Sequence, residues 1–216
     1  MSVPAVKSAG AALGAPDDSI EDGRRRYFDN RLSVTVVNVF QGDFYVSTTP
    51  GEMLATVLGS CIAACVRDPI AKCGGMNHFL LPAGKQSSDS EATGLALRYG
   101  SYSMEQLING VLAAGGRRER LEIKVFGGAN VVRGLSGVGH KNSAFIEEYL
   151  LNEGFDIAAK HIRGSWPRKV HFFPDTGQVR MRELKGKTAE RVFDKETKLR
   201  ARPKVPETAG TIELFD

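Results

Sequence analysis

Two apolar runs on either side of a strong turn signal constrain this chain more than any other feature. The runs cover residues 61–66 and 76–81, and Asp68-Pro69 stands between them. Short apolar runs that flank such a dipeptide are typical of two antiparallel strands joined by a tight turn. The sequence therefore predicts a β-hairpin over this region.

The hairpin brings a cysteine and a histidine together. If Pro69 and Ile70 are the two turn residues, counting outward places Cys61 opposite His78. Directly opposed residues have Cβ atoms ~5 Å apart on one face of the sheet. A thiol and an imidazole at that distance can exchange a proton, as a cysteine nucleophile requires. A bulge at Gly74-Gly75 would shift this register.

The cysteine count favours a reducing compartment. There are three cysteines, an odd number, and they show no paired C-x-x-C pattern or histidine at metal spacing. No apolar stretch reaches the ~18 residues that cross a bilayer, and the N-terminus lacks the apolar core of a signal peptide. We expect a cytoplasmic protein without a metal or an organic cofactor.

The net charge of +4 includes short basic clusters at residues 24–26 and 117–120. Nucleic-acid binding needs a basic face with interleaved aromatic residues, and these clusters have none. The mild positive bias suits an acidic protein partner better.

The composition divides the chain into three parts. Residues 1–23 are rich in Ala, Gly, Ser, Pro and Asp and predict a disordered leader. Residues 24–184 carry the periodic patterns of one folded domain, including a polar loop at 84–90 that could border the site. Residues 185–216 are charged and poor in apolar pattern, which predicts a mobile tail.

Within the domain, the order of elements is mixed rather than alternating. Helices are expected at residues 91–114 and from Asn142 or Ser143, as N-cap, to about 152, with Gly154 as the C-cap. Besides the hairpin, strands are expected at 34–40, 43–47, 53–58, 121–125, 155–162, 169–173 and 178–184. This order predicts an α+β layered sandwich of mostly antiparallel β-sheet with two main helices.

Several residues near the hairpin are candidates for the chemistry. Gly59-Ser60 can present Cys61 at a strand end, and Thr56 could orient the imidazole or be an ordinary strand residue. The backbone N–H groups of Gly127-Gly128 could bind a substrate carbonyl, or simply form a turn.

The remaining cysteines and histidines are weaker candidates. Cys65 and Cys73 are expected in the core, and His161 and His171 as half-buried strand residues. His140 is expected in a glycine-rich loop and could approach a pocket.

Several blocks of the sequence resemble the CheD family of chemoreceptor glutamine deamidases. The resemblance covers about residues 24–184, and its blocks are 58–61, 68–69, 75–82, 98–100, 126–129 and 167–170. It implies Cys61 as nucleophile, His78 as base and Thr56 as the third catalytic residue.

Five residues are expected to bind the substrate. Three of them directly precede the expected nucleophile and base, and the other two are the glycines with candidate backbone donors: Gly59, Ser60, Asn77, Gly127 and Gly128.

The resemblance also implies a fold like that of glutamine-deamidating toxins, and no cofactor. The substrates would be glutamine side chains on the cytoplasmic helices of methyl-accepting chemotaxis receptors, hydrolysed to glutamate through a thioester. A CheC phosphatase is an expected partner. Two alternatives stay open: a cysteine acyltransferase or amidohydrolase acting on another substrate, and a receptor- or CheC-binding module with little turnover.

Overall fold

The computed structural model describes residues 25–82, 90–130 and 137–201. The expected leader and nearly all of the polar loop at 84–90 lie outside these ranges. The strands are β1 (Arg26–Asp29), β2 (Val34–Asn38), β3 (Phe44–Ser47), β4 (Met53–Leu58), β5 (Ile62–Asp68), β6 (Cys73–Asn77), β7 (Glu122–Gly127), β8 (Ile157–Ile162), β9 (Arg168–Phe172) and β10 (Val179–Glu183). The helices are α1 (Ser90–Ala113), the 3₁₀ helix η1 (Arg118–Arg120), α2 (Val138–Asn152) and α3 (Gly186–Ala201).

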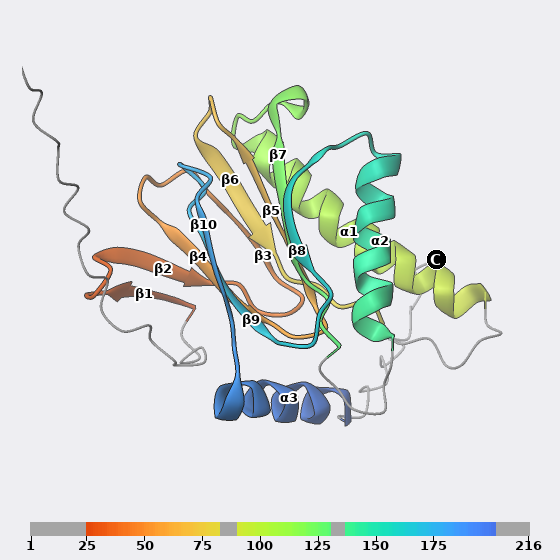
Figure 1. Cartoon of the computed structure of the whole chain (residues 1–216). Coiled ribbons are helices and arrows are strands. Elements are labelled where there is room, and N and C mark those ends of the chain that lie inside the picture. The colour runs from red at the N-terminus through yellow and green to blue at the C-terminus, as the bar shows by residue number, and fades with distance from the viewer. Residues whose placement is uncertain (1–24, 83–89, 131–136, 202–216) are drawn as a thin grey trace, which may run out of the picture.

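The strands form two sheets of five. Sheet A has the order β1-β2-β4-β9-β10, and sheet B has the order β3-β6-β5-β7-β8. Most neighbours are antiparallel, while β2 with β4 and β7 with β8 are parallel. Helices α1 and α2 lie together beside sheet B, and α3 lies apart from them near β9 (Figure 1). The predicted α+β layered architecture is confirmed.

Strand β5 is buried on both faces because it separates two cores. Ala63 and Cys65 point into the core between the two sheets. Ile62, Ala64 and Val66 point into the core between sheet B and helices α1 and α2. Because side chains alternate along a strand, a continuous apolar run can fill both cores at once.

Helix α1 covers sheet B through one apolar stripe. Met104, Leu107, Ile108 and Val111 recur at helical spacing and are all buried in the same core. The helix ends before Gly115, whose φ of 98° takes the chain out of the helical path.

The second helix begins earlier than its predicted N-cap. The N-cap is Gly137, so Asn142 and Ser143 lie inside α2 and are buried rather than at its start. The C-cap is Glu153 rather than the predicted Gly154, which follows it with a φ of 71°. The Asn142 amide bonds to Ser60 and Leu81, and the Ser143 hydroxyl donates to the Gly139 carbonyl one turn earlier in the helix, so neither side chain caps its start.

Helix α3 was missed by the sequence analysis. It covers the first half of the segment from residue 185 that was expected to be a charged, mobile tail. Ala189 and Val192 on this helix are buried. Widely spaced apolar residues among many charged ones give too weak a period to stand out from a solvated segment.

The hairpin turn has four residues rather than two. Asp68 pairs with Cys73, and the Asp68 Oδ1 atom accepts hydrogen bonds from Ile70 N–H at 2.8 Å and Ala71 N–H at 3.0 Å. Lys72 adopts a left-handed φ of 53° and returns the chain to the ladder. The predicted pairing of Asp68 with Ala71 was therefore wrong by two residues, because the aspartate side chain stabilises a wider turn.

The wider turn changes which residues lie opposite each other. The Ile62–Phe79 bridge continues the ladder, so His78 lies opposite Ala63 rather than Cys61. A shift of two residues keeps every side chain on its original face. Cys61 and His78 are thus diagonal neighbours on one face, a separation of ~7–8 Å that an imidazole can span.

Asp68 also fastens this turn to the segment after α1. Its Oδ2 atom accepts hydrogen bonds from Arg120 at 2.6 Å and from Arg117 N–H at 2.9 Å, and its side chain is 0% exposed. Burial would raise the pKa of Asp68, but the hydrogen bonds from Arg120 and from backbone N–H groups outweigh it and lower the pKa.

Replacing this carboxylate should destabilise the fold. We expect Asp68→Asn to lower the free energy of unfolding by about 3 kcal/mol near pH 7, since it removes one partner of a buried pair. The lowered pKa means that this stability is present above the ordinary carboxyl pKa of ~3.9 and is lost as the pH falls below it. Urea denaturation at several pH values measures both effects.

The exposed pair of Arg118 and Glu153 provides the control. Glu153→Gln should cost less than about 1 kcal/mol, because both side chains are half exposed. An equal loss in the two variants would contradict a special role for Asp68.

Candidate active site

Cys61 lies immediately before β5, with 3% of its surface exposed. Its carbonyl accepts a hydrogen bond from Gly128 N–H at 2.7 Å. The next residue, Ile62, exchanges two backbone hydrogen bonds of 2.9 Å with Phe79. The backbone on the C-terminal side of the thiol is therefore fixed to two neighbouring segments.

His78 follows the last residue of β6 and is also buried. Its N–H donates to the Asp43 carbonyl at 3.0 Å, and its carbonyl accepts from Gly42 N–H at 2.7 Å. The β2–β3 loop therefore forms hydrogen bonds with both the N–H and the carbonyl of His78.

Thr56 connects strand β4 of sheet A to the histidine of sheet B. Its Oγ1 atom donates to the Val39 carbonyl at 2.7 Å and lies 2.8 Å from His78 Nδ1. His78 Nδ1 also lies 3.3 Å from the same carbonyl, which can only accept a hydrogen bond. Both neighbours favour a proton on Nδ1, and this tautomer leaves the basic lone pair on Nε2.

One further side chain contacts the thiol and a second interacts with it electrostatically, and the sequence analysis gave neither a role. The Cys61 thiol contacts Gln41 Oε1 at 3.7 Å. Tyr99 of α1 lies close enough that burial first, and then Cys61 and Asp43, raise the pKa of its hydroxyl. That hydroxyl therefore stays protonated at neutral pH and can donate a hydrogen bond.

The segment that leads into Cys61 is held through its backbone. Gly59 carbonyl accepts from Ala129 N–H at 2.9 Å, and Ser60 carbonyl accepts from Asn142 Nδ2 at 2.7 Å. Asn142 Oδ1 also accepts from Leu81 N–H at 3.2 Å. One amide of α2 thus joins the segments that carry the cysteine and the histidine.

Asn77 lies on the other face of β6 from His78. Its Oδ1 atom accepts from Ala64 N–H at 2.9 Å, and its Nδ2 atom donates to the Ser103 carbonyl at 3.2 Å. The side chain is fully buried, so it joins β5 to α1 inside the protein.

Gly127 and Gly128 form a tight turn under the cysteine. Their φ values are 115° and 68°, and a Cβ on Gly127 would lie 2.1 Å from the Cys61 carbonyl oxygen. Only glycine fits this close approach. The Gly128 N–H group, which the sequence analysis suggested as a donor to the substrate, bonds to the Cys61 carbonyl instead. The turn therefore holds the cysteine backbone.

The other two cysteines are in chemically different surroundings. Burial raises the pKa of Cys65, and burial followed by the nearby Asp68 raises the pKa of Cys73. Both thiols therefore stay protonated and belong to the hydrophobic cores.

The remaining histidines lie away from this cluster. His140 is exposed on α2, within a helix rather than a loop, and His161 is exposed rather than half-buried. His171 is half-buried as expected, and burial, Lys169 and Arg180 lower its pKa to about 4.

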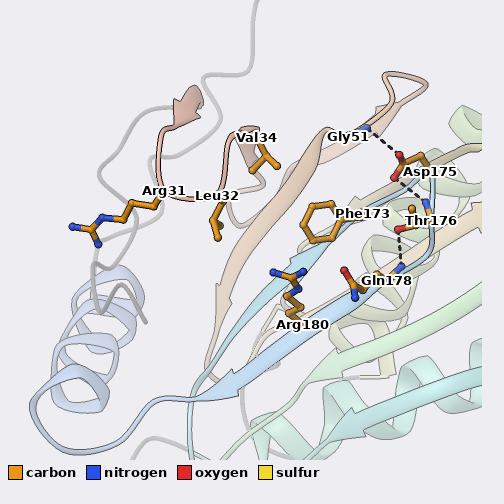
Figure 2. Close-up of a pocket in the computed structure, with 9 residues that line it drawn as sticks. All are labelled: Arg31, Leu32, Val34, Gly51, Phe173, Asp175, Thr176, Gln178 and Arg180. Atoms are coloured by element: carbon orange, nitrogen blue, oxygen red, sulfur yellow. Dashed lines mark hydrogen bonds between the residues drawn. The ribbon is translucent and has the colours of Figure 1, made fainter. Parts of the chain in front are cut away.

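A cavity of ≈ 320 Å³ lies on the opposite face of sheet A from the core that contains Cys61 (Figure 2). It is open between the β1–β2 loop and the β9–β10 turn, where Asp175 accepts a hydrogen bond from Gly51 N–H at 2.9 Å. None of the candidate site residues lines it. Its lining is Arg31, Leu32, Val34, Gly51, Phe173, Asp175, Thr176, Gln178 and Arg180.

Among the described residues, no group of three or more His, Cys, Asp or Glu side chains is arranged to hold a metal ion. None of the described helices is both long and apolar enough to cross a membrane.

The structure thus defines a two-sheet α+β protein in which a thiol, an imidazole and a threonine hydroxyl gather where β5 begins and β6 ends. A family model described as CheD chemotactic sensory transduction matches residues 80–183. The chain is 50% identical over 195 residues to a probable chemoreceptor glutamine deamidase CheD of Rhodopseudomonas palustris (strain BisA53), covering 90% of this chain and 91% of the relative.

Other relatives with the same name agree. Identity is 43% over 180 residues with the protein of Hahella chejuensis (strain KCTC 2396), covering 83% of this chain and 85% of the relative. It is 47% over 190 residues with that of Caulobacter vibrioides (strain NA1000 / CB15N), covering 88% and 98%. This chain belongs to the CheD family.

One solved structure, the hypothetical protein YfiH of Bacillus licheniformis, matches with a TM-score of 0.33 and 12% identity, covering 57% of this chain and 50% of that one. That likeness is too distant to inform the fold.

The contrast among the three cysteines is testable by alkylation. We expect iodoacetamide to label Cys61 before Cys65 and Cys73 in the folded protein near pH 8, because burial keeps the latter two thiols protonated. Peptide mapping after timed labelling identifies the modified residue. Labelling of Cys65 or Cys73 at the rate of Cys61 would contradict the assignment.

Proposed function

We propose that this chain hydrolyses the side-chain amides of specific glutamines on chemoreceptors, releasing ammonia and leaving glutamate. The proposal rests on membership of the CheD family, whose curated relatives carry the name chemoreceptor glutamine deamidase. The observation that supports the proposal most directly is the contact of Thr56 Oγ1 with His78 Nδ1. This contact orients the imidazole ring on the same face of sheet B as Cys61. The substrates would be the cytoplasmic helices of methyl-accepting receptors, so the protein would act in the cytoplasm.

In the first half of the reaction, His78 Nε2 accepts the proton of the Cys61 thiol. The thiolate attacks the carboxamide carbon of the substrate glutamine, and the carbonyl oxygen becomes an oxyanion. His78 then protonates the departing nitrogen. Ammonia is released, and the substrate acyl group remains bound to Cys61 as a thioester. No metal or organic cofactor takes part in this scheme.

In the second half, His78 Nε2 removes a proton from water, which attacks the thioester carbon. The bond to sulfur breaks, glutamate leaves, and the thiol regains its proton. Thr56 acts as a positioning residue throughout, because it contacts the histidine rather than the reacting atoms.

Donors near the thiol would stabilise the oxyanion. The protonated Tyr99 hydroxyl is the side-chain donor that we propose, and a well-placed donor contributes ~3 kcal/mol. The nominated substrate-binding residues would shape the site mainly through its backbone, since Gly128 N–H bonds to the Cys61 carbonyl and the Gly59 and Ser60 carbonyls are held by Ala129 and Asn142.

Each turnover would replace a neutral amide on a receptor helix with a carboxylate. This changes the electrostatics between helices and creates a methylation site, which fits a role in chemotaxis adaptation. A CheC-type phosphatase is the partner that we propose for regulation.

Mass spectrometry of receptors co-expressed with this chain tests the function. We expect Gln-to-Glu conversion with wild type, and a loss of about 10³-fold or more with Cys61→Ala because the nucleophile is absent. Cys73→Ala, which removes a thiol from the helix-side core, is the matched control and should keep its activity.

Full activity of Cys61→Ala would contradict the mechanism. Adding a primary amine separates deamidation from acyl transfer, since a transferase would incorporate the amine into the receptor glutamine. Receptor binding by wild type without any conversion would favour a binding module instead.

Removing the threonine hydroxyl should affect catalysis more than substrate binding. We expect Thr56→Val to lower kcat roughly tenfold to a hundredfold, a part of the ~10²–10⁴-fold that a positioned general base contributes. KM should change little, and Thr56→Ser should restore most of kcat because it restores the hydroxyl. Equal losses in the Val and Ser variants would show that packing matters rather than the hydrogen bond to His78.

A further inference from the structure

A glutamine side chain of this protein already contacts the proposed nucleophile. The Cys61 thiol donates a hydrogen bond to Gln41 Oε1 at 3.7 Å. Gln41 is an exposed residue of the β2–β3 loop. Its carboxamide is the functional group that a glutamine deamidase attacks.

The loop holds this glutamine in place through its backbone. Phe40 carbonyl accepts from Asp43 N–H at 2.9 Å, and Gly42 has a φ of 91°, so residues 40–43 form a type II turn with Gln41 at its second position. Gly42 N–H and Asp43 carbonyl both bond to the backbone of His78. The turn that contains Gln41 is thus fixed by the same hydrogen bonds that position the proposed base, His78.

Tyr99 lies close to the same turn. A Cβ added at Gly42 would lie 3.6 Å from the Tyr99 hydroxyl oxygen. Burial, followed by the charges of Cys61 and Asp43, raises the pKa of Tyr99, so a protonated hydroxyl lies beside the turn that contains Gln41. The Gln41 carboxamide therefore has a nucleophile, the Cys61 thiol, and a hydrogen-bond donor, the Tyr99 hydroxyl, in its neighbourhood.

We propose that this chain deamidates its own Gln41. The inference rests on the proposed function, since it uses the same nucleophile and base. The carboxamide carbon is one C=O bond, ~1.23 Å, from the oxygen that contacts the thiol. Rotation of the glutamine side chain can bring that carbon to the ~3–3.5 Å from which attack begins, and the reaction gains from being intramolecular.

The step balances with water as the co-reactant. Cys61 sulfur bonds to Gln41 Cδ, the Cδ–Nε2 bond breaks, and the nitrogen leaves as ammonia with a proton from His78. Water then adds to the thioester carbon, the sulfur leaves with its proton restored, and residue 41 becomes glutamate. The new carboxylate beside Cys61 opposes formation of a second negative charge on the thiol.

Peptide mapping by mass spectrometry tests this proposal on the full chain. Wild type and Cys61→Ala are purified in parallel, analysed at once, and analysed again after incubation near pH 7 in ¹⁸O-labelled water. We expect glutamate at position 41 in wild type, with labelled oxygen in any fraction converted during incubation. We expect glutamine at that position in Cys61→Ala.

Gln178 serves as the internal control, because it is exposed and lines the cavity on the far face of sheet A. It should remain glutamine in both proteins. Conversion of Gln41 to the same extent in Cys61→Ala would show spontaneous hydrolysis and overturn the proposal, as would intact Gln41 in wild type.

A receptor fragment included in the same incubation separates the two proposals. Receptor conversion with intact Gln41 would overturn self-deamidation and leave the proposed function standing. Absence of both conversions would count against both. Conversion of Gln41 that requires Cys61, with Gln178 unchanged, supports the inference whatever the rate on the receptor.

Discussion

The burial of strand β5 on both faces is the constraint on which the rest of this structure depends. Its alternate side chains fill the core between the sheets and the core beneath α1 and α2. A slip of one residue would exchange the contents of the two cores, so the register of this strand is fixed. Cys61 directly precedes the strand, and its position is fixed with it.

The histidine is positioned in a different way, by a loop rather than by packing. The turn at Gln41-Gly42 is bonded to the His78 backbone, and Thr56 and the Val39 carbonyl engage its ring. The ring orientation therefore depends on the path of the β2–β3 loop. Such preorganisation removes a cost that would otherwise be met during the reaction.

The sequence analysis predicted the features that depend on local apolar pattern. It missed those that depend on which groups a side chain contacts in the folded protein. Strand β4, helix α1 and the α+β class follow from apolar periodicity. The predicted pairing of Cys61 with His78 was wrong, but the two residues stay on one face because the error in the turn was two residues. Residue type does not reveal which group an amide will meet. Asn142 therefore looked like a helix cap, and Gln41 had no neighbouring signal in the sequence that tied it to the thiol.

The four-residue turn at the tip of the β5–β6 hairpin has a consequence for how such proteins can vary. Adding or removing two residues there leaves the thiol and the imidazole facing the same core, although their offset along the ladder changes. A single-residue change turns the imidazole toward the helices. Only length changes by an even number of residues therefore keep both groups on one face of the hairpin. Relatives that keep both groups should differ there by even numbers of residues unless a bulge compensates.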